Sequence, residues 1–560
     1  MGLLIHVLVN LLRLLRNIRR TLRRPPDFVW IPVTGALPEF EPSRRGLLRR
    51  RLDPRTLTPS LQSIRSRLDR ILSDGRVDGV VLRIQELEAG WAALEELRGE
   101  LQRFRWEGKK VVAYLVGSDT GSYYLASAAD EIYTPPLSTL NVVGLRARVN
   151  FLKDTLGSLG LETEVIAVSP YKSAADTISR SDFSEESREQ VERLLDDRFE
   201  EILSAISSGR NLPPEEVRAL IDRAPYPASK AVEKGLLDGA LYEDELAGKL
   251  SRGEKPAKLA EWGVASKTLR LPYRRRARKV VGLVVVEGTI QRGKSRKLPI
   301  PLPLLGREQA GSDSVVAALR VAEKCRRVGA VLLHVDSPGG DALAADLIWR
   351  EVLRIRAKKP VVVLMGNAAA SGGYYVSAPA NHIVARKHTI TGSIGVILTR
   401  PVAAGLLRKL KVNPVAIERG AHSNLLDPRR PPTPDELAVL KGQLNTFYDG
   451  FRDRVSSGRG MGTDVLEKVA GGRVWTGSEA LERGLVDEIG DLRAALGKAR
   501  ELAGIPDGPE VLARISPQSG GRPAPGEPVQ GAVDAMLIAF SDLETPRVWA
   551  LAPYEISDGW

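Results

Sequence analysis

The sequence is poor in the residues that build disulfide and metal sites. It contains a single cysteine, Cys325, among 560 residues, which excludes an intramolecular disulfide framework and a thiolate metal cage. It contains five histidines, and none stands in an H-E-x-x-H pattern or another close metal-ligand spacing. We therefore expect no metal site and no cofactor.

The composition is that of a globular protein with more than one domain. The 43% of apolar residues is enough for packed cores, and together with 27% of charged residues it excludes the disordered and fibrous classes. The length is several times that of a typical domain. Two or more domains are expected.

The excess of positive charge is confined to two short segments. The net charge is +13, and residues 1–60 hold twelve arginines against four acidic residues, while residues 274–279 add five basic side chains. Neither segment interleaves aromatic residues with its charges, as a base-stacking surface would. We therefore expect no nucleic-acid partner.

The beginning of the first segment, residues 3–24, has the pattern of an amphipathic helix. Its polar residues recur in steps of three and four, which places them on one helical stripe opposite a leucine-rich side. The stripe consists of His6, Asn10, Arg13, Asn17, Arg20 and Arg24. The apolar run 3–9, broken only by His6, is too short to cross a bilayer. We expect residues 1–27 to lie in a membrane interface with their arginines facing anionic headgroups, on an undetermined side. A long signal anchor and a helix packed on the protein are the alternatives.

The chain contains an internal repeat at an offset of 251 residues. Residues 76–84 align with 327–335, and Gly121–Tyr124 aligns with Gly372–Tyr375. Two homologous halves explain this repeat. The predicted parts are an interface helix (1–27), a first half (28–250), a basic linker (251–279), a second half (280–505) and a tail (506–560) that opens with the Gly/Pro-rich stretch 518–531.

Each half alternates strand-like and helix-like segments. In the second half the apolar runs 280–286, 330–335 and 360–365 have strand length, and the segments 315–326 and 342–357 between them have helical spacing. This order predicts an α/β fold with a parallel sheet covered by helices. Functional sites in such folds form in the loops after the strands.

Two of those loops contain small residues around a serine. Ser371 stands between three alanines and two glycines, which permits a tight strand-to-helix turn that exposes its hydroxyl beside unpaired N–H groups. Gly339 and Gly340 follow the neighbouring strand and could bring a second N–H group toward an oxyanion. A plain close-packed turn is the alternative interpretation. A serine nucleophile needs a base, and composition does not choose among the lysines and histidines.

Five motifs of the chain form a recognisable set. Four lie in the second half, V-D-S-P-G-G at 335–340, A-A-A-S-G-G-Y-Y at 368–375, T-G-S-I-G-V at 391–396 and G-R-V-W-T-G-S-E-A-L-E-R-G-L-V-D at 472–487, and one lies in the first half, S-P-Y-K-S-A-A-D at 169–176. Together, and in their order along the chain, they resemble the motifs of the signal peptide peptidase A family of membrane-associated serine peptidases in its long, duplicated form. The resemblance implies tandem crotonase-like, Clp-protease-like α/β domains. It spans about residues 28–505.

The resemblance also implies the catalytic residues. It assigns Ser371 as the nucleophile and Lys172 as the general base, with Ser393 orienting the lysine. Backbone N–H groups of Gly339 or Gly340 and of Gly372 would form the oxyanion hole. We interpret Trp475, within the motif at 472–487, as a packing residue.

The repeat is consistent with this assignment. At the offset of 251, Ser371 aligns with Thr120 and Lys172 aligns with Ser423, so each half retains one member of the pair. One composite site per chain follows.

The implied function is that of a serine endopeptidase at the bacterial cytoplasmic membrane. Remnant signal peptides and other hydrophobic peptides are its expected substrates, bound extended beside a strand edge, and a homo-oligomer, with a tetramer favoured, is its expected assembly. Three alternatives remain: a crotonase-type acyl-CoA enzyme, a Ser-His-Asp peptidase that uses His334 or His422, and a non-catalytic membrane scaffold.

Overall fold

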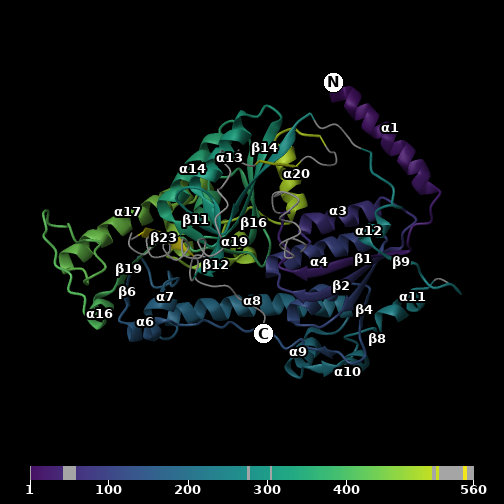
Figure 1. Ribbon diagram of the computed structural model, residues 1–560, viewed down its shortest axis with the longest axis horizontal. Coiled ribbons are helices and arrows are strands. Elements are labelled where there is room, and N and C mark those ends of the chain that lie inside the picture. The colour runs from purple at the N-terminus through teal and green to yellow at the C-terminus, as the bar shows by residue number, and fades with distance from the viewer. Residues whose placement is uncertain are drawn as a thin grey trace. The chain divides into compact units, whose positions relative to one another are not determined.

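The computed structural model describes seven stretches of the chain, which fall into two compact α/β units (Figure 1). The described stretches are 2–41, 59–251, 253–273, 278–302, 306–506, 512–515 and 547–551. Unit 1 comprises residues 1–147, 195–276 and 556–560, and unit 2 comprises 148–194 and 277–555. The segment 148–194 therefore belongs to the unit that carries Ser371, and the boundary at residue 194 falls inside helix α8 (Glu185–Arg210).

Unit 1 is built on a parallel sheet with the order β8-β4-β3-β2-β1-β9. Its strands are β1 (Phe28–Gly35), β2 (Gly79–Leu87), β3 (Lys110–Leu115), β4 (Glu131–Thr134), β8 (Gly239–Ala240) and β9 (Leu259–Glu261). Strand β9 lies in the predicted linker and extends the sheet by pairing with β1. A short antiparallel pair, β5 (Thr139–Leu140) and β7 (Tyr226–Pro227), lies outside this sheet.

Several helices of unit 1 contribute buried apolar residues to the core formed with this sheet. In α3 (Leu61–Leu72) the residues Ile64, Leu68 and Ile71 recur at helical spacing and are fully buried, and the Ser60 hydroxyl caps the helix start. Besides α1 and the end of α8, the unit also contains α4 (Trp91–Trp106), α5 (Thr120–Ala126), α9 (Pro214–Asp222), α10 (Ala228–Glu233), η2 (Glu243–Glu245), α11 (Leu246–Lys249) and α12 (Trp262–Ala265).

A buried ion cluster joins α3 to α4 in unit 1. The Arg65 guanidinium contacts Glu39, Glu96 and Glu100, and its side chain is only 8% exposed. Replacing Arg65 with methionine is expected to lower the free energy of unfolding by about 3–5 kcal/mol, because buried carboxylates lose their counter-charge. Chemical denaturation measures this change. Lys230→Met, which removes an exposed ion pair with Glu233, is the control and is expected to leave stability unchanged. Equal effects of the two variants would contradict this prediction.

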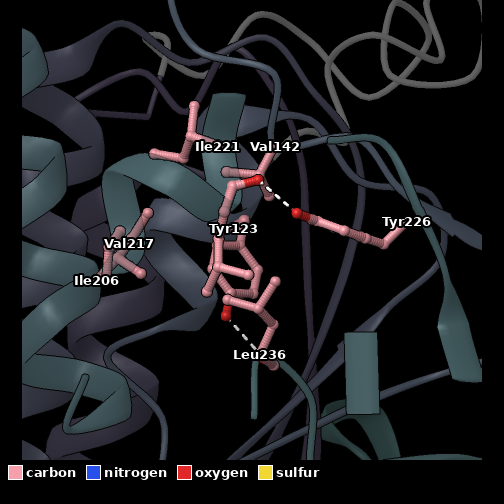
Figure 2. A pocket seen from close by; sticks show the side chains of 8 residues that line it. Tyr123, Val142, Ile206, Val217, Ile221, Tyr226 and Leu236 are labelled. Carbon is pink, nitrogen blue, oxygen red and sulfur yellow. Dashed lines mark hydrogen bonds between the residues drawn. The ribbon is translucent and has the colours of Figure 1, made fainter. Parts of the chain in front are cut away.

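A small apolar cavity lies in unit 1 beside Tyr123 (Figure 2). The Tyr123 hydroxyl donates to the Leu236 carbonyl at 2.7 Å, and the cavity volume of about 10 Å³ leaves no room for a ligand. The same contact recurs in unit 2, where the Tyr374 hydroxyl donates to the Leu485 carbonyl at 2.8 Å. Tyr374 follows Tyr123 by 251 residues, so the repeat extends from the sequence to individual hydrogen bonds.

Unit 2 contains a corresponding sheet with the order β20-β18-β16-β14-β10-β22, and β17 pairs with β16 and β21. Its strands are β10 (Val280–Glu287), β14 (Val328–Ser337), β16 (Val361–Ala370), β17 (His382–Ala385), β18 (Ile390–Gly392), β20 (Val474–Thr476), β21 (Glu488–Ile489) and β22 (Leu512–Arg514). The pairs β10–β14 and β14–β16 are parallel. The three strands predicted in this half are thus confirmed, as are its helices α13 (Ser312–Lys324) and α14 (Ala342–Arg356).

A second sheet of unit 2 has the order β12-β13-β11-β15-β23-β19-β6. Its strands are β6 (Glu162–Ala167), β11 (Thr289–Gln291), β12 (Arg296–Leu302), β13 (Gly306–Gly311), β15 (Gly339–Asp341), β19 (Ile397–Val402) and β23 (Arg547–Leu551). Strand β6 pairs antiparallel with β19 along its whole length. This pairing attaches the segment that precedes Lys172 to the unit that carries Ser371.

The remaining helices of unit 2 surround these sheets. They are α6 (Lys153–Leu159), α7 (Asp176–Ser179), α15 (Gly372–Ser377), α16 (Ala404–Lys409), α17 (Pro434–Arg459), α18 (Thr463–Val469), α19 (Gly477–Glu482) and α20 (Leu492–Leu502). Trp475, on β20, is buried in the core as predicted, and its indole N–H donates to the Val469 carbonyl at 3.0 Å. The Gly/Pro-rich stretch 518–531 lies outside the described residues.

The N-terminal amphipathic helix is present as α1 (Gly2–Thr21), but part of its polar stripe faces the protein. Arg13, Asn17 and Arg20 donate to main-chain carbonyls within residues 269–272. The expectation that the arginines face headgroups is therefore wrong for Arg13 and Arg20, because carbonyl acceptors hold them against unit 1. The apolar side is exposed and includes Leu8, Leu11, Leu12, Leu15, Ile18 and Leu22. Within the described residues, no helix combines the length and hydropathy needed to cross a membrane.

Candidate active site

The structure brings Lys172, Ser371 and Ser393 together inside unit 2. The Lys172 Nζ atom lies 2.5 Å from Ser371 Oγ, 2.8 Å from Ser393 Oγ and 2.9 Å from the Ser393 carbonyl oxygen. Lys172 is 2% exposed and both serines are fully buried. The three residues predicted to form the dyad and to orient its lysine thus form one hydrogen-bonded cluster.

Ser371 occupies a strained turn between β16 and α15. Its φ of +55° is rare for a residue with a side chain, and such conformations persist where the surroundings enforce them. The Ser371 N–H donates to the Gly392 carbonyl at 2.8 Å. A Cβ on Gly373 would lie 2.6 Å from the Ser337 carbonyl oxygen, so the first turn of α15 packs directly on the end of β14. These contacts hold the serine at the carboxyl end of the parallel sheet.

Lys172 lies in a turn that follows β6. The Lys172 N–H donates to the Ser169 carbonyl at 3.1 Å, which closes the turn. Gly472 approaches the lysine so closely that a Cβ there would lie 2.7 Å from Lys172 Cβ. Gly395 lies on the same path, where a Cβ would be 3.3 Å from Lys172 Cδ. Because neither glycine has a side chain, the Lys172 side chain can pass between them and reach Ser371.

Residues outside the predicted site brace this lysine turn. The Gln190 amide donates to the Tyr171 carbonyl at 3.1 Å and accepts from the Val474 N–H at 3.0 Å. The Arg473 guanidinium stacks on the Tyr171 ring, 3.9 Å from its centroid. Sequence reasoning missed these roles. Arg473 and Val474 belong to the motif at 472–487, so that motif was the available signal, whereas nothing in the sequence marks Gln190.

Burial controls the charge of Lys172. The whole side chain is removed from water, and this desolvation sets the pKa of its amine well below the ordinary value of 10.5. The three atoms around Nζ are hydroxyl and carbonyl oxygens of Ser371 and Ser393. Such a site favours a neutral amine, which has a lone pair available to accept a proton.

The glycines predicted for the oxyanion hole lie beside the serine. Gly372 is the first residue of α15, where N–H groups have no acceptor within the helix. The Gly339 N–H donates to Ser337 Oγ at 3.2 Å and therefore already has a partner. Gly340 has a φ of +155°, and a Cβ there would lie 2.0 Å from the Ile290 carbonyl oxygen, so only glycine fits this position. The oxyanion role of these glycines stays a prediction.

The alternative catalytic residues lie in other surroundings. The nitrogen hydrogen-bonded to the Ser371 hydroxyl belongs to Lys172, while His334 is buried within β14 and His422 lies on an exposed turn. In the first half, Thr120 begins α5 and its hydroxyl donates to the Gly144 carbonyl at 2.9 Å. Among the described residues, no cluster of three histidine, cysteine or acidic side chains could hold a metal ion.

A strand of the same chain fills the slot between β15 and β19. Strand β15 contains Gly339 and Gly340, and β19 begins at Ile397, four residues after Ser393. The strand β23 of the same chain lies between them and pairs antiparallel with both. In this register Leu551 is opposite Gly339 and Trp549 is opposite Ile397. The backbone edges of β15 and β19 thus hold an extended strand of this chain between them.

Comparisons with known proteins agree with this architecture. The sequence profile of peptidase family S49 matches residues 103–256 and 354–506, and the two matches contain Lys172 and Ser371 respectively. The predicted tandem α/β fold is thus confirmed: this is an α/β protein that contains two copies of one peptidase module. The chain belongs to peptidase family S49, a family of serine peptidases.

Individual relatives show how far the similarity extends. The chain is 35% identical to the chloroplast serine protease SPPA of Arabidopsis thaliana, an alignment that covers 77% of this chain and 64% of that protein. It is 33% identical to Protease 4 of Haemophilus influenzae, covering 77% of this chain and 71% of the relative. A ClpP1 mutant from Listeria monocytogenes is a structural match with a TM-score of 0.25 and 15% identity, covering 38% of this chain and 94% of that one.

Proposed function

We propose that the protein is a membrane-associated serine endopeptidase in which Ser371 is the nucleophile and Lys172 is the general base. The observation that carries this proposal is the 2.5 Å contact between Lys172 Nζ and Ser371 Oγ in a fully buried cluster. A lysine with a lowered pKa next to a serine hydroxyl is the arrangement that such catalysis requires. Membership of family S49 supports the same chemistry.

Ser393 orients the lysine in this mechanism. A neutral amine has two N–H donors and one lone pair. Its N–H groups donate to the hydroxyl and carbonyl oxygens of Ser393, at 2.8 and 2.9 Å, and the lone pair then points to Ser371 Oγ. The Ser371 hydroxyl proton therefore has a direct path to the amine.

The reaction proceeds as acyl transfer. Lys172 takes the hydroxyl proton as Ser371 Oγ bonds to the peptide carbonyl carbon, and the N–H groups of Gly340, in β15, and of Gly372 receive the oxyanion. The carbon–nitrogen bond then breaks, and the lysine ammonium protonates the leaving amine. A water molecule then attacks the acyl-enzyme and loses one proton to Lys172. The ester bond breaks, the lysine ammonium returns that proton to Ser371 Oγ, and the carboxylic acid leaves with the serine hydroxyl and the neutral amine restored.

The substrate is proposed to be a hydrophobic peptide in extended form, such as a remnant signal peptide. The slot between β15 and β19 supports this mode, because it offers strand edges on both sides, and a bound substrate takes the place of β23. One relative, from Enterococcus faecium, is named a putative signal peptide peptidase, 34% identical over 236 residues.

Membrane association through α1 is part of the proposal. The exposed apolar residues of the helix can enter a lipid interface while Arg16, Arg19 and Arg23, which are also exposed, remain at the headgroups. We place the protein at the bacterial cytoplasmic membrane, as a homo-oligomer of duplicated chains with a tetramer favoured by the family resemblance.

The pH dependence of cleavage tests the general base. Activity is expected to rise as pH passes through the lowered pKa of Lys172 and to reach a plateau well below the ordinary lysine value of 10.5, because only the neutral amine accepts a proton. The measurement is kcat for cleavage of an uncharged hydrophobic peptide between about pH 5 and 10. A flat profile, or one that rises only near 10.5, would refute the lysine as base.

A further inference from the structure

Gln190 is a fully buried glutamine of α8 to which the proposed mechanism assigns no role. Its amide N–H donates to the Tyr171 carbonyl at 3.1 Å, and its amide oxygen accepts from the Val474 N–H at 3.0 Å. Both partners are main-chain groups, and they lie 19 and 284 residues away along the chain. One uncharged side chain therefore joins two segments that the sequence does not connect.

Each of these segments leads directly to a group of the proposed site. Tyr171 is the residue before Lys172. The carbonyl of the residue before Val474 accepts the Ser393 N–H at 2.6 Å, and the hydroxyl and carbonyl oxygens of Ser393 hold the lysine amine. Gln190 thus links the main chain of the general base to the main chain that holds its orienting serine.

A second side chain of α8 holds strand β20 independently of Gln190. Arg193 donates to the Val474 carbonyl at 2.5 Å, forms an ion pair with Glu479, and stacks on the Trp475 ring, 4.6 Å from its centroid. These contacts remain when Gln190 is replaced. Loss of the Gln190 amide is therefore expected to release the lysine turn while β20 stays attached to the helix.

The charged groups that flank the lysine turn balance one another. The Arg473 guanidinium forms an ion pair with Glu189 at 3.1 Å, and Arg193 forms the second pair with Glu479. Replacing Gln190 with another uncharged residue leaves this balance intact. A change in the titration of the lysine in such a variant therefore reports a change in its position or its hydration, and not a change in the surrounding charge.

The internal repeat retains this amide in one half only. The sequence S-S-G-R ends α8 at 207–210 and ends α17 at 456–459, an offset of 249 that aligns Gln190 with Val439. The buried amide is present in the half that contributes Lys172, and an apolar side chain takes its place in the other half. This distribution is expected of a group that serves the lysine, because a group needed only to build the helix would be useful in both halves.

We propose that Gln190 is a positioning residue, which holds the Lys172 turn at a fixed distance from the segment that carries Ser393 and so keeps the lysine amine directed at Ser371. It acts through the main chain on both sides and touches none of the reacting atoms. This inference rests on the proposed function, since it adds a residue to the same site.

The test measures kcat and KM for an uncharged hydrophobic peptide between about pH 5 and 10 with full-length wild type and Gln190→Met. The kcat of Gln190→Met is expected to fall by about tenfold or more, with KM within about threefold of the wild type. Its acidic limb is expected to move to higher pH, because a loosened turn admits water and weakens the desolvation that lowers the pKa of Lys172. Gln443→Met, at an exposed glutamine on α17, is the matched control and is expected to keep the wild-type profile.

A second variant, Gln190→Glu, preserves the size of the side chain. Its carboxylate still accepts from the Val474 N–H but cannot donate to the Tyr171 carbonyl. The acidic limb is expected to move in the same direction as in Gln190→Met. Melting temperatures measured in parallel show which variants are folded in the assay.

The other outcomes would overturn the positioning role. They are a wild-type kcat in a Gln190 variant, a lower kcat with an unshifted acidic limb, and failure of both variants to fold, which would give Gln190 a structural role instead. If Ser371→Ala is inactive in the same assay, the proposed function survives each of these results. Cleavage that persists in Ser371→Ala would overturn the proposed function and this inference together.

Discussion

Peptide cleavage is expected to fall by at least about a thousandfold in both Ser371→Ala and Lys172→Met. The first variant removes the nucleophile. The second replaces the amine 2.5 Å from it with an apolar side chain of similar length, so the serine proton has no acceptor. Mass-spectrometric detection of products from a hydrophobic signal peptide, in detergent, measures both losses. Because the two residues act as one unit, the double variant is expected to be no worse than either single variant.

The melting temperature of Lys172→Met distinguishes a loss of catalysis from a folding defect. The pKa of Lys172 is lowered in the folded protein, so the unfolded state binds more protons between that pKa and 10.5. In the pH range between these two values, burial of the lysine therefore lowers the free energy of unfolding more strongly as the pH falls. Lys172→Met removes this cost, and its melting temperature near neutral pH is expected to equal or exceed that of the wild type. A marked drop in melting temperature together with lost activity would indicate a structural role instead.

The same variants discriminate among the alternative functions. Robust cleavage in either single variant would remove that residue from the mechanism and return attention to His334 and His422. Acyl-CoA turnover that survives both substitutions would favour a crotonase-type enzyme. A wild type without turnover on either substrate class would favour a scaffold.

The fold could be predicted from local sequence patterns to a large extent. The runs that became β10, β14 and β16 are continuously apolar because both faces of a parallel sheet are covered, and this pattern is visible without a structure. The sequence pattern also identifies Ser371 as a candidate, since its small neighbours mark a tight turn after a strand. The pattern does not identify Lys172, because the residues alone leave many lysines equivalent and only the family resemblance selects one.

What the sequence could not reveal depends on contacts between distant segments. Strand β6 pairs with β19, more than 200 residues later, and this pairing attaches the Lys172 segment to unit 2. No periodicity within β6 indicates its partner. The surroundings of the polar stripe on α1 could not be predicted for the same reason. Helical spacing shows that Arg13 and Arg20 share a face, but it does not show whether lipid or carbonyl groups lie opposite them.

Two adjacent glycines beside Lys172 provide a test of positioning without removing any catalytic group. Gly471 and Gly472 have φ values of +71° and +87°, so alanine strains the backbone at either position. They differ in what a Cβ would meet. At Gly472 it would lie 2.7 Å from Lys172 Cβ, whereas at Gly471 the nearest atom is Ser169 Oγ at 3.5 Å, an ordinary contact.

Gly472→Ala is therefore expected to displace Lys172 from Ser371 and to lower kcat by about a hundredfold, since a shift of about 1 Å costs that much when a reacting group is misplaced. Gly471→Ala carries the same backbone strain without the clash, so its kcat is expected to stay within about threefold of the wild type. Melting temperatures measured in parallel establish that both variants fold. Equal losses of activity in the two variants would mean that backbone strain, and not the position of the lysine amine, limits the reaction.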